Sequence, residues 1–252
     1  MPRWAHFLFF LVLAVPAWAQ FRAGAAKVVI TPDLEKHGPI YLAGFGQNRK
    51  ATGVHDDLFA RCLAVAVLKR PVVLCGVDSI GLFYDDVAKI REGIDADVVV
   101  ASLHDHEAPD TMGLWGPAEG KSGISEAYNA FVVEQTRRAV RSAVTAMQPA
   151  IARLATVHTS ELDSFIHDDR PPEVHDSDVV VLNLTHTDGR PMATLVNWAN
   201  HPETLGSKNT LITADYSANV YRTLEERLGG TAVFINGAVG GCSRRSERRS
   251  RA

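Results

Sequence analysis

The sequence predicts an α/β or α+β fold in which helices pack against a mixed β-sheet. The composition, with 46% hydrophobic and 22% charged residues in a chain of 252, is that of a globular protein long enough to bury a core. Segments with the pattern of strands outnumber those with the pattern of helices, and the two kinds alternate in part of the chain. The sequence shows no internal repeat and no linker, which favours one continuous unit.

Eight segments are apolar over the length of a strand. They are residues 25–31, 58–68, 72–77, 97–103, 150–158, 178–187, 191–198 and 232–236. Residues 69–71 predict a hairpin between the second and third segments, and Asp188-Gly189 predicts another between the sixth and seventh. Pro32 ends the first segment, and residues 32–56, rich in Gly, Pro and Asn, predict a long loop.

Three segments have the spacing of helices. Residues 85–94 are predicted to be helical, and residues 216–228 form a second helix that Gly229-Gly230 closes. The longest helix is expected over residues 124–147. Its apolar stripe is expected to consist of Ala127, Phe131, Val132, Ala139, Val140 and Val144.

The two ends of the chain differ from its body. Residues 1–19 have a basic residue, an apolar run and the small residues Ala17 and Ala19, and so predict a signal peptide that is cleaved before Gln20. The expected mature chain has no transmembrane segment and is secreted or periplasmic, because no other stretch is apolar enough to span a bilayer. Residues 243–252 hold five Arg and no large apolar residue. They predict a basic disordered tail, either a solvated or frame-shifted end or an arm for an anionic surface.

The charge of the body argues against a nucleic-acid partner. Between the signal peptide and the tail, 20 basic residues face 28 acidic residues, so no basic surface is predicted. The cysteines leave a choice open. Cys62 and Cys75 both lie in strand-like segments, where they either form a disulfide in an oxidising compartment or remain two buried thiols.

Histidines follow two of the predicted strands. Residues 97–103 look like a buried strand and end at His104, which is followed two positions later by His106; His201 lies after another strand. On an extended chain His104 and His106 point to the same side, where they can offer a metal two imidazoles, or one ligand and one acid–base group. The alternative is a pair of surface loop histidines. A metallo-β-lactamase site is excluded, because Ala108 and Pro109 stand where that pattern requires Asp-His.

The ordered set of motifs resembles the N-terminal domain of the neutral/alkaline, non-lysosomal ceramidases. The resemblance runs from about residue 23 to residue 243 and rests on the order of the segments. They are residues 44–46 (GFG), 52–56 (TGVHD), 58–61 (LFAR), 103–109 (LHDHEAP), 169–171 (DRP), 200–202 (NHP), 215–216 (DY) and 234–240 (FINGAVG).

The resemblance implies a zinc-dependent hydrolase of linear amide bonds that splits ceramide, or a related lipid amide at a membrane surface, into an amine and a fatty acid. It makes His104 and His201 ligands of Zn²⁺ and His106 an acid–base or supporting residue. It also implies that Arg170 contacts the substrate or the oxyanion, and that Ser243 stands at the position of the family's serine nucleophile. Zn²⁺ would polarise the amide carbonyl and lower the pKa of a bound water or hydroxyl.

Several positions depart from the family pattern. Gly241 and Arg244 stand where the family has Asp and Pro around the serine, and the family's two further zinc ligands, Glu and Tyr, lie beyond this chain. Residues 20–242 are therefore expected to be an incomplete ceramidase-like domain. Two alternatives to an active amidase follow: a secreted domain without catalysis, and a metal-dependent hydrolase of another substrate.

Overall fold

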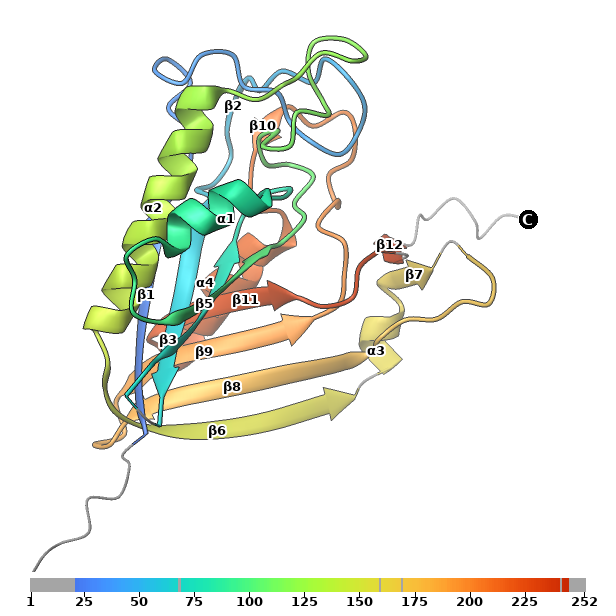
Figure 1. The fold of residues 1–252 in the computed structure, drawn as a ribbon. Helices are drawn as coiled ribbons and strands as arrows, with labels where there is room; N and C mark the ends of the chain where they lie inside the picture. Colours follow the sequence, from blue (N-terminus) through green and yellow to red (C-terminus); the bar gives the residue numbers. More distant parts are fainter. Residues whose placement is uncertain (1–20, 68, 159, 169, 241, 245–252) are drawn as a thin grey trace, which may run out of the picture.

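An eight-stranded mixed sheet dominates the structure, a computed structural model that describes residues 21–67, 69–158, 160–168, 170–240 and 242–244 (Figure 1). The strand order is β11-β9-β8-β6-β1-β3-β4-β5. The bounds of these strands are β1 Arg22–Val29, β3 Phe59–Ala66, β4 Val72–Val77, β5 Asp97–Ser102, β6 Gln148–His158, β8 Asp178–His186, β9 Pro191–Trp198 and β11 Thr231–Asn236. These are the eight segments that the sequence predicts, so the mixed sheet with packed helices is confirmed.

Four short strands form two further pairs. Strand β2 (Gly53–Val54) lies parallel to β10 (Leu211–Ile212), and β7 (Ile166–Asp168) lies antiparallel to β12 (Cys242–Arg244). The sequence pattern does not predict these pairs, because two or three residues are too few to show a period. The described helices are α1 Tyr84–Arg91, α2 Glu126–Thr145, α3 Ser160–Asp163 and α4 Tyr216–Leu228. The last agrees with the predicted helix at both ends.

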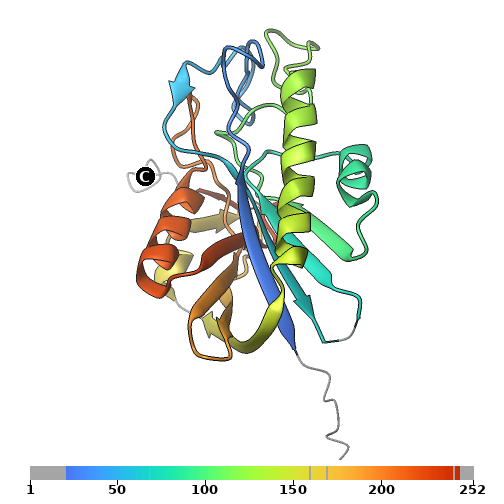
Figure 2. The ribbon, with the colours of Figure 1, turned by 90° about the vertical axis from the view of Figure 1, so that its left-hand side faces the viewer.

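The long helix α2 packs against β1, β3 and β4, whereas α4 packs against β9 and β11 (Figure 2). The N-cap of α2 is Ser125, whose hydroxyl accepts a hydrogen bond from the Tyr128 backbone N–H. Its buried positions follow the helical period and are Tyr128, Val132, Thr136, Ala139, Val140 and Ala143. Three members of the predicted stripe are thus buried. Ala127 is exposed instead, because Tyr128 takes the core-facing position of the first turn.

The sheet curls until its two ends meet. Although β11 and β5 are the two outer strands, β11 packs against the face of β3, β4 and β5. The contact is closest at Gly76 of β4, where an added Cβ would lie 2.0 Å from the carbonyl oxygen of Phe234 in β11. Only glycine permits this approach. Strand β5, predicted to be buried, is an edge strand whose Val99 is exposed, because nothing pairs beyond it in the described sheet.

Cys62 and Cys75 form a disulfide. They lie directly opposite one another in the antiparallel pair of β3 and β4, and both side chains are fully buried in the core beneath α2. The alternative of two free thiols is therefore ruled out. As for membranes, none of the described helices combines the length and the apolar composition needed to cross a bilayer.

Removal of the disulfide is expected to weaken the hairpin of β3 and β4. The Cys62→Ala/Cys75→Ala variant should lose about 2–4 kcal/mol of unfolding free energy, because a cross-link that closes a short loop restricts the unfolded chain. Urea unfolding followed by circular dichroism measures the loss. Reductant should lower the stability of the wild type and leave the double variant unchanged. Equal stability of the oxidised and reduced wild type would contradict the role assigned to the bond.

Candidate metal centre

His104 is held by its backbone and by its ring. It is the second residue after β5 and has a φ of 63°, a left-handed conformation that is uncommon for a residue with a side chain. Its Nδ1 lies 3.0 Å from the carbonyl oxygen of Ile80. Since a carbonyl only accepts, Nδ1 carries the proton and donates it, and the lone pair lies on Nε2. This is the arrangement of a metal-binding imidazole that a backbone carbonyl orients.

His106 lies two residues after His104 in the same loop, and its ring is tightly packed. An added Cβ at Gly44 would lie 2.3 Å from its ring, and the ring of Phe45 meets it edge to face at 5.1 Å. Its Nδ1 lies 3.5 Å from a carboxylate oxygen of Glu203. Burial, followed by the proximity of His201 and His104, lowers the pKa of His106 to about 3, so the ring is neutral at physiological pH.

His201 reaches the same place from the other end of the sheet. It lies three residues after β9, which pairs in parallel with β11. The backbone N–H of His106 donates to the carbonyl of Pro202 at 2.9 Å, so the two histidine-bearing loops are hydrogen-bonded to each other. The hydroxyl of Tyr216, at the start of α4, donates to the carbonyl of Asn200 at 2.8 Å and so holds the loop that carries His201.

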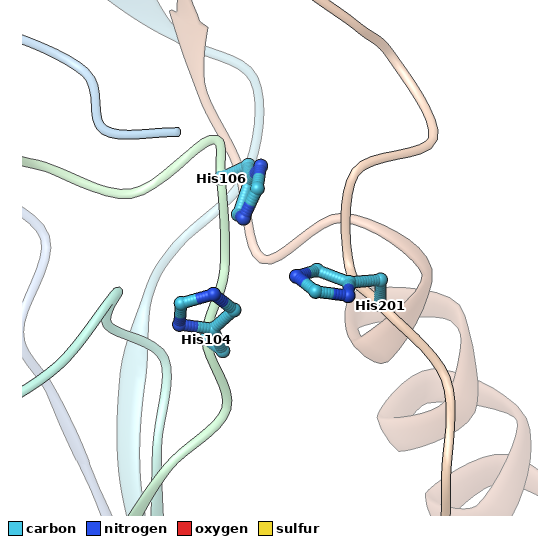
Figure 3. Close-up of side chains that lie close together, drawn as sticks. All are labelled: His104, His106 and His201. Atoms are coloured by element: carbon cyan, nitrogen blue, oxygen red, sulfur yellow. The ribbon is translucent and has the colours of Figure 1, made fainter. Parts of the chain in front are cut away.

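The three rings surround a common point (Figure 3). Ring nitrogens of His104, His106 and His201 all lie within 4.8 Å of one another, and the ring centroids are 4.9–5.1 Å apart. The structure thus brings together residues that are almost 100 positions apart in the sequence. The interpretation as separate surface loop histidines does not describe this cluster.

The donor set fits a transition metal. Neutral imidazole nitrogens suit Zn²⁺ and its neighbours in the first transition row, and His104 and His201, with His106 beside them, supply nitrogens of this kind. Burial also lowers the pKa of His104, which favours the unprotonated ring that a metal requires. The residues present can therefore hold such an ion, although they do not select among the metals of that group.

Asp105, between the two histidines of the first loop, takes no part in the cluster. Its side chain is 1% exposed, and its Oδ1 accepts the backbone N–H of Glu107 at 2.9 Å. Burial and then the nearby Asp215 raise the pKa of Asp105 well above its usual range. This carboxyl therefore shapes the loop, while the rings of His104 and His106 lie near the common point.

Arg49, which no sequence motif marks, supports His106. Its guanidinium is buried, donates to the backbone carbonyls of Ala43 and His106, and lies 3.3 Å from a carboxylate oxygen of Glu107. The ring of Phe45 stacks beside it, 4.9 Å from the guanidinium carbon. Nothing in the local sequence distinguishes this arginine from a solvated one in a glycine-rich loop, and only the folded chain shows its partners.

The other two predicted site residues lie in a separate part of the chain. Arg170 follows β7, is exposed, and donates to Asp168 at 3.1 Å within its own loop. The backbone of Ser243, in β12, pairs with His167 of β7, while the side chain of Ser243 lies outside the described residues. The signal peptide and residues 245–252 of the basic tail also lie outside them. The roles expected of Arg170 and Ser243 stay predictions.

The comparisons with known proteins identify the fold. No protein-family model and no curated protein matches the sequence. Among solved structures, neutral ceramidase from Pseudomonas aeruginosa matches with a TM-score of 0.75 at 17% identity over 92% of this chain and 41% of that protein. A ceramidase complexed with C2 matches with a TM-score of 0.72 at 18% identity over 89% and 38%. The chain spans less than half the length of these two proteins, and over that part it has the fold of a neutral ceramidase.

Proposed function

We propose that this chain is the metal-binding part of a zinc-dependent hydrolase of linear amides, and that its substrate is ceramide or a related lipid amide. The observation that carries the proposal is the cluster of three histidines, supplied by two loops and placed on a ceramidase fold. Amide hydrolysis requires polarisation of a carbonyl and an activated nucleophile, and bound zinc supplies both when it is held by imidazoles with an open position.

Within this proposal the residues divide into two roles. His104 and His201 bind the metal, each through a ring at the end of a strand. His106 is assigned to proton transfer on the sequence resemblance, and its Nδ1 lies 3.5 Å from a carboxylate oxygen of Glu203. Arg170 is assigned to the substrate or its oxyanion and Ser243 to the attacking hydroxyl, both on the sequence resemblance alone.

Export is part of the same proposal. The sequence of residues 1–19 predicts a signal peptide, and the disulfide between Cys62 and Cys75 supports an oxidising compartment. A secreted or periplasmic enzyme would meet lipid amides at the outer surface of a membrane.

A metal-binding domain without hydrolysis of its own is the second candidate. The observation that favours it is that the described cluster consists of metal-ligand side chains alone. A panel of metal-loaded assays with amide, ester and phosphate substrates separates the candidates. Amide turnover supports the first, no turnover with metal bound supports the second, and turnover of esters or phosphates alone supports a different hydrolase.

Metal content tests the assignment of ligands. We expect about one zinc per chain in the wild type, as in a mononuclear catalytic site, and its loss in the His104→Ala and His201→Ala variants. Elemental analysis after exhaustive dialysis measures this. The control is His158→Ala, an exposed histidine on β6 that also pairs with a carboxylate, and it should leave the zinc content unchanged. Zinc that survives loss of both His104 and His201 would refute the site.

The role of His106 is tested by separating binding from turnover. His106→Ala should keep most of its zinc and lose amide hydrolysis by a factor of about 10²–10⁴, the usual contribution of an acid–base group. A fluorogenic N-acyl amide and a metal assay on the same samples give both values. Loss of zinc as complete as in His104→Ala would instead make His106 a third ligand.

A further inference from the structure

Asn236, the last residue of β11, contacts both histidine-bearing segments. Its Nδ2 donates to the carbonyl of Leu103 at 2.9 Å and to the carbonyl of Asn200 at 2.8 Å. Its Oδ1 accepts the backbone N–H of Asn200 at 3.1 Å. Leu103 is the residue before His104, and Asn200 is the residue before His201. One side-chain amide therefore links the backbone just ahead of two proposed metal ligands.

The three hydrogen bonds fix the orientation of the amide. Both N–H groups meet carbonyl oxygens, and the oxygen meets an N–H, so every bond joins a donor to an acceptor. The flipped amide would place its oxygen against two carbonyls and its NH₂ against an N–H. Asn is also the only residue of its size with two donors and one acceptor in this geometry, since Asp has no donor when ionised.

The hydrogen bond from Asn236 to Leu103 joins the ends of two strands that are not paired in the sheet. Strands β5 and β11 are at opposite ends of the strand order and share no ladder of hydrogen bonds. The peptide group that Asn236 holds at Leu103 leads directly into His104, whose left-handed φ requires support from the surrounding structure. Another link between the loops is the hydrogen bond from His106 to Pro202, which lies beyond the two ligands.

We infer that Asn236 is a positioning residue that sets the separation of His104 and His201 before a metal binds. The inference rests on the proposed function, because it assumes that these two histidines are ligands. The spacing of His104 and His201 would thus depend on Asn236, a side chain that does not contact the ion. Loss of the link should weaken metal binding and change the geometry of the bound ion without removing a ligand.

The test is a Co²⁺ titration of the chain, with affinity and the visible absorption spectrum as readouts. Asn236→Asp keeps the size of the side chain but turns carboxylate oxygens toward two carbonyls, and Asn236→Ala removes the link. Both should bind Co²⁺ about 10- to 100-fold more weakly, as is usual when a residue that orients a metal ligand is lost, and with a shifted ligand-field spectrum.

Asn197 supplies a matched control. It lies on β9, is half-buried like Asn236, and its Nδ2 donates to the carbonyl of Ile235 at 2.8 Å, also between β9 and β11. Its hydrogen bond does not reach either histidine segment. Asn197→Asp and Asn197→Ala should lower the melting temperature to a similar extent and leave Co²⁺ affinity within about twofold of the wild type, the precision expected when no metal-orienting contact is lost.

The outcomes separate this inference from the proposed function. Asn236 variants that are folded and bind Co²⁺ with the affinity and spectrum of the wild type would overturn the inference alone. A wild type that binds no Co²⁺ would overturn the proposed metal site, and the inference with it. Should the Asn236 variants fail to fold, hydrogen exchange on the metal-free wild type decides: protection of the Asn200 N–H supports a preformed link, and exchange at the rate of an open amide rejects it.

Discussion

The close approach of β11 to β4 is the constraint on which the candidate site depends. Without a side chain at Gly76, the carbonyl of Phe234 comes to a distance that no other residue would permit, and the two ends of an eight-stranded sheet fold against one another. The outer strands are each paired in parallel with a neighbour, β5 with β4 and β11 with β9. The carboxyl ends of these pairs carry the histidines, so the curl of the sheet converts two distant loops into one cluster.

Polar contacts then hold the loops where the curl has brought them. Asn236 hydrogen-bonds to the backbone just before His104 and just before His201. The N–H of His106 donates to the carbonyl of Pro202, and the guanidinium of Arg49 donates to the carbonyl of His106. Each of these links uses a backbone group of a loop, where regular secondary structure provides no partner. Burial lowers the pKa values of His104 and His106, and His104 has its Nε2 lone pair free. The fold thus presents nitrogen donors rather than ion pairs.

Local pattern was enough to predict all eight strands of the main sheet and the helix α4, because these segments have clear periods and are closed by Pro32, Asp188-Gly189 or Gly229-Gly230. Local pattern also marked His104, His106 and His201, since each follows a strand. It was insufficient wherever the cause is a long-range contact. The edge position of β5 follows from the strand order, and the roles of Arg49 and Asn236 depend on partners 57 and 133 residues away. The pairs β2–β10 and β7–β12 are too short to have a period at all.

The fold and the proposed function are supported by different observations. A likeness at 17% identity establishes how the backbone runs, and such a backbone can serve more than one chemistry. The histidine cluster is a stronger argument, because three rings that converge inside a largely buried loop pair incur a desolvation cost that packing alone does not require. Preorganised ligands lose little conformational freedom when an ion binds, and this gain is available only if the spacing is held in advance. Under the proposed function, the links that fix the two loops hold the ligands at the spacing that an ion requires.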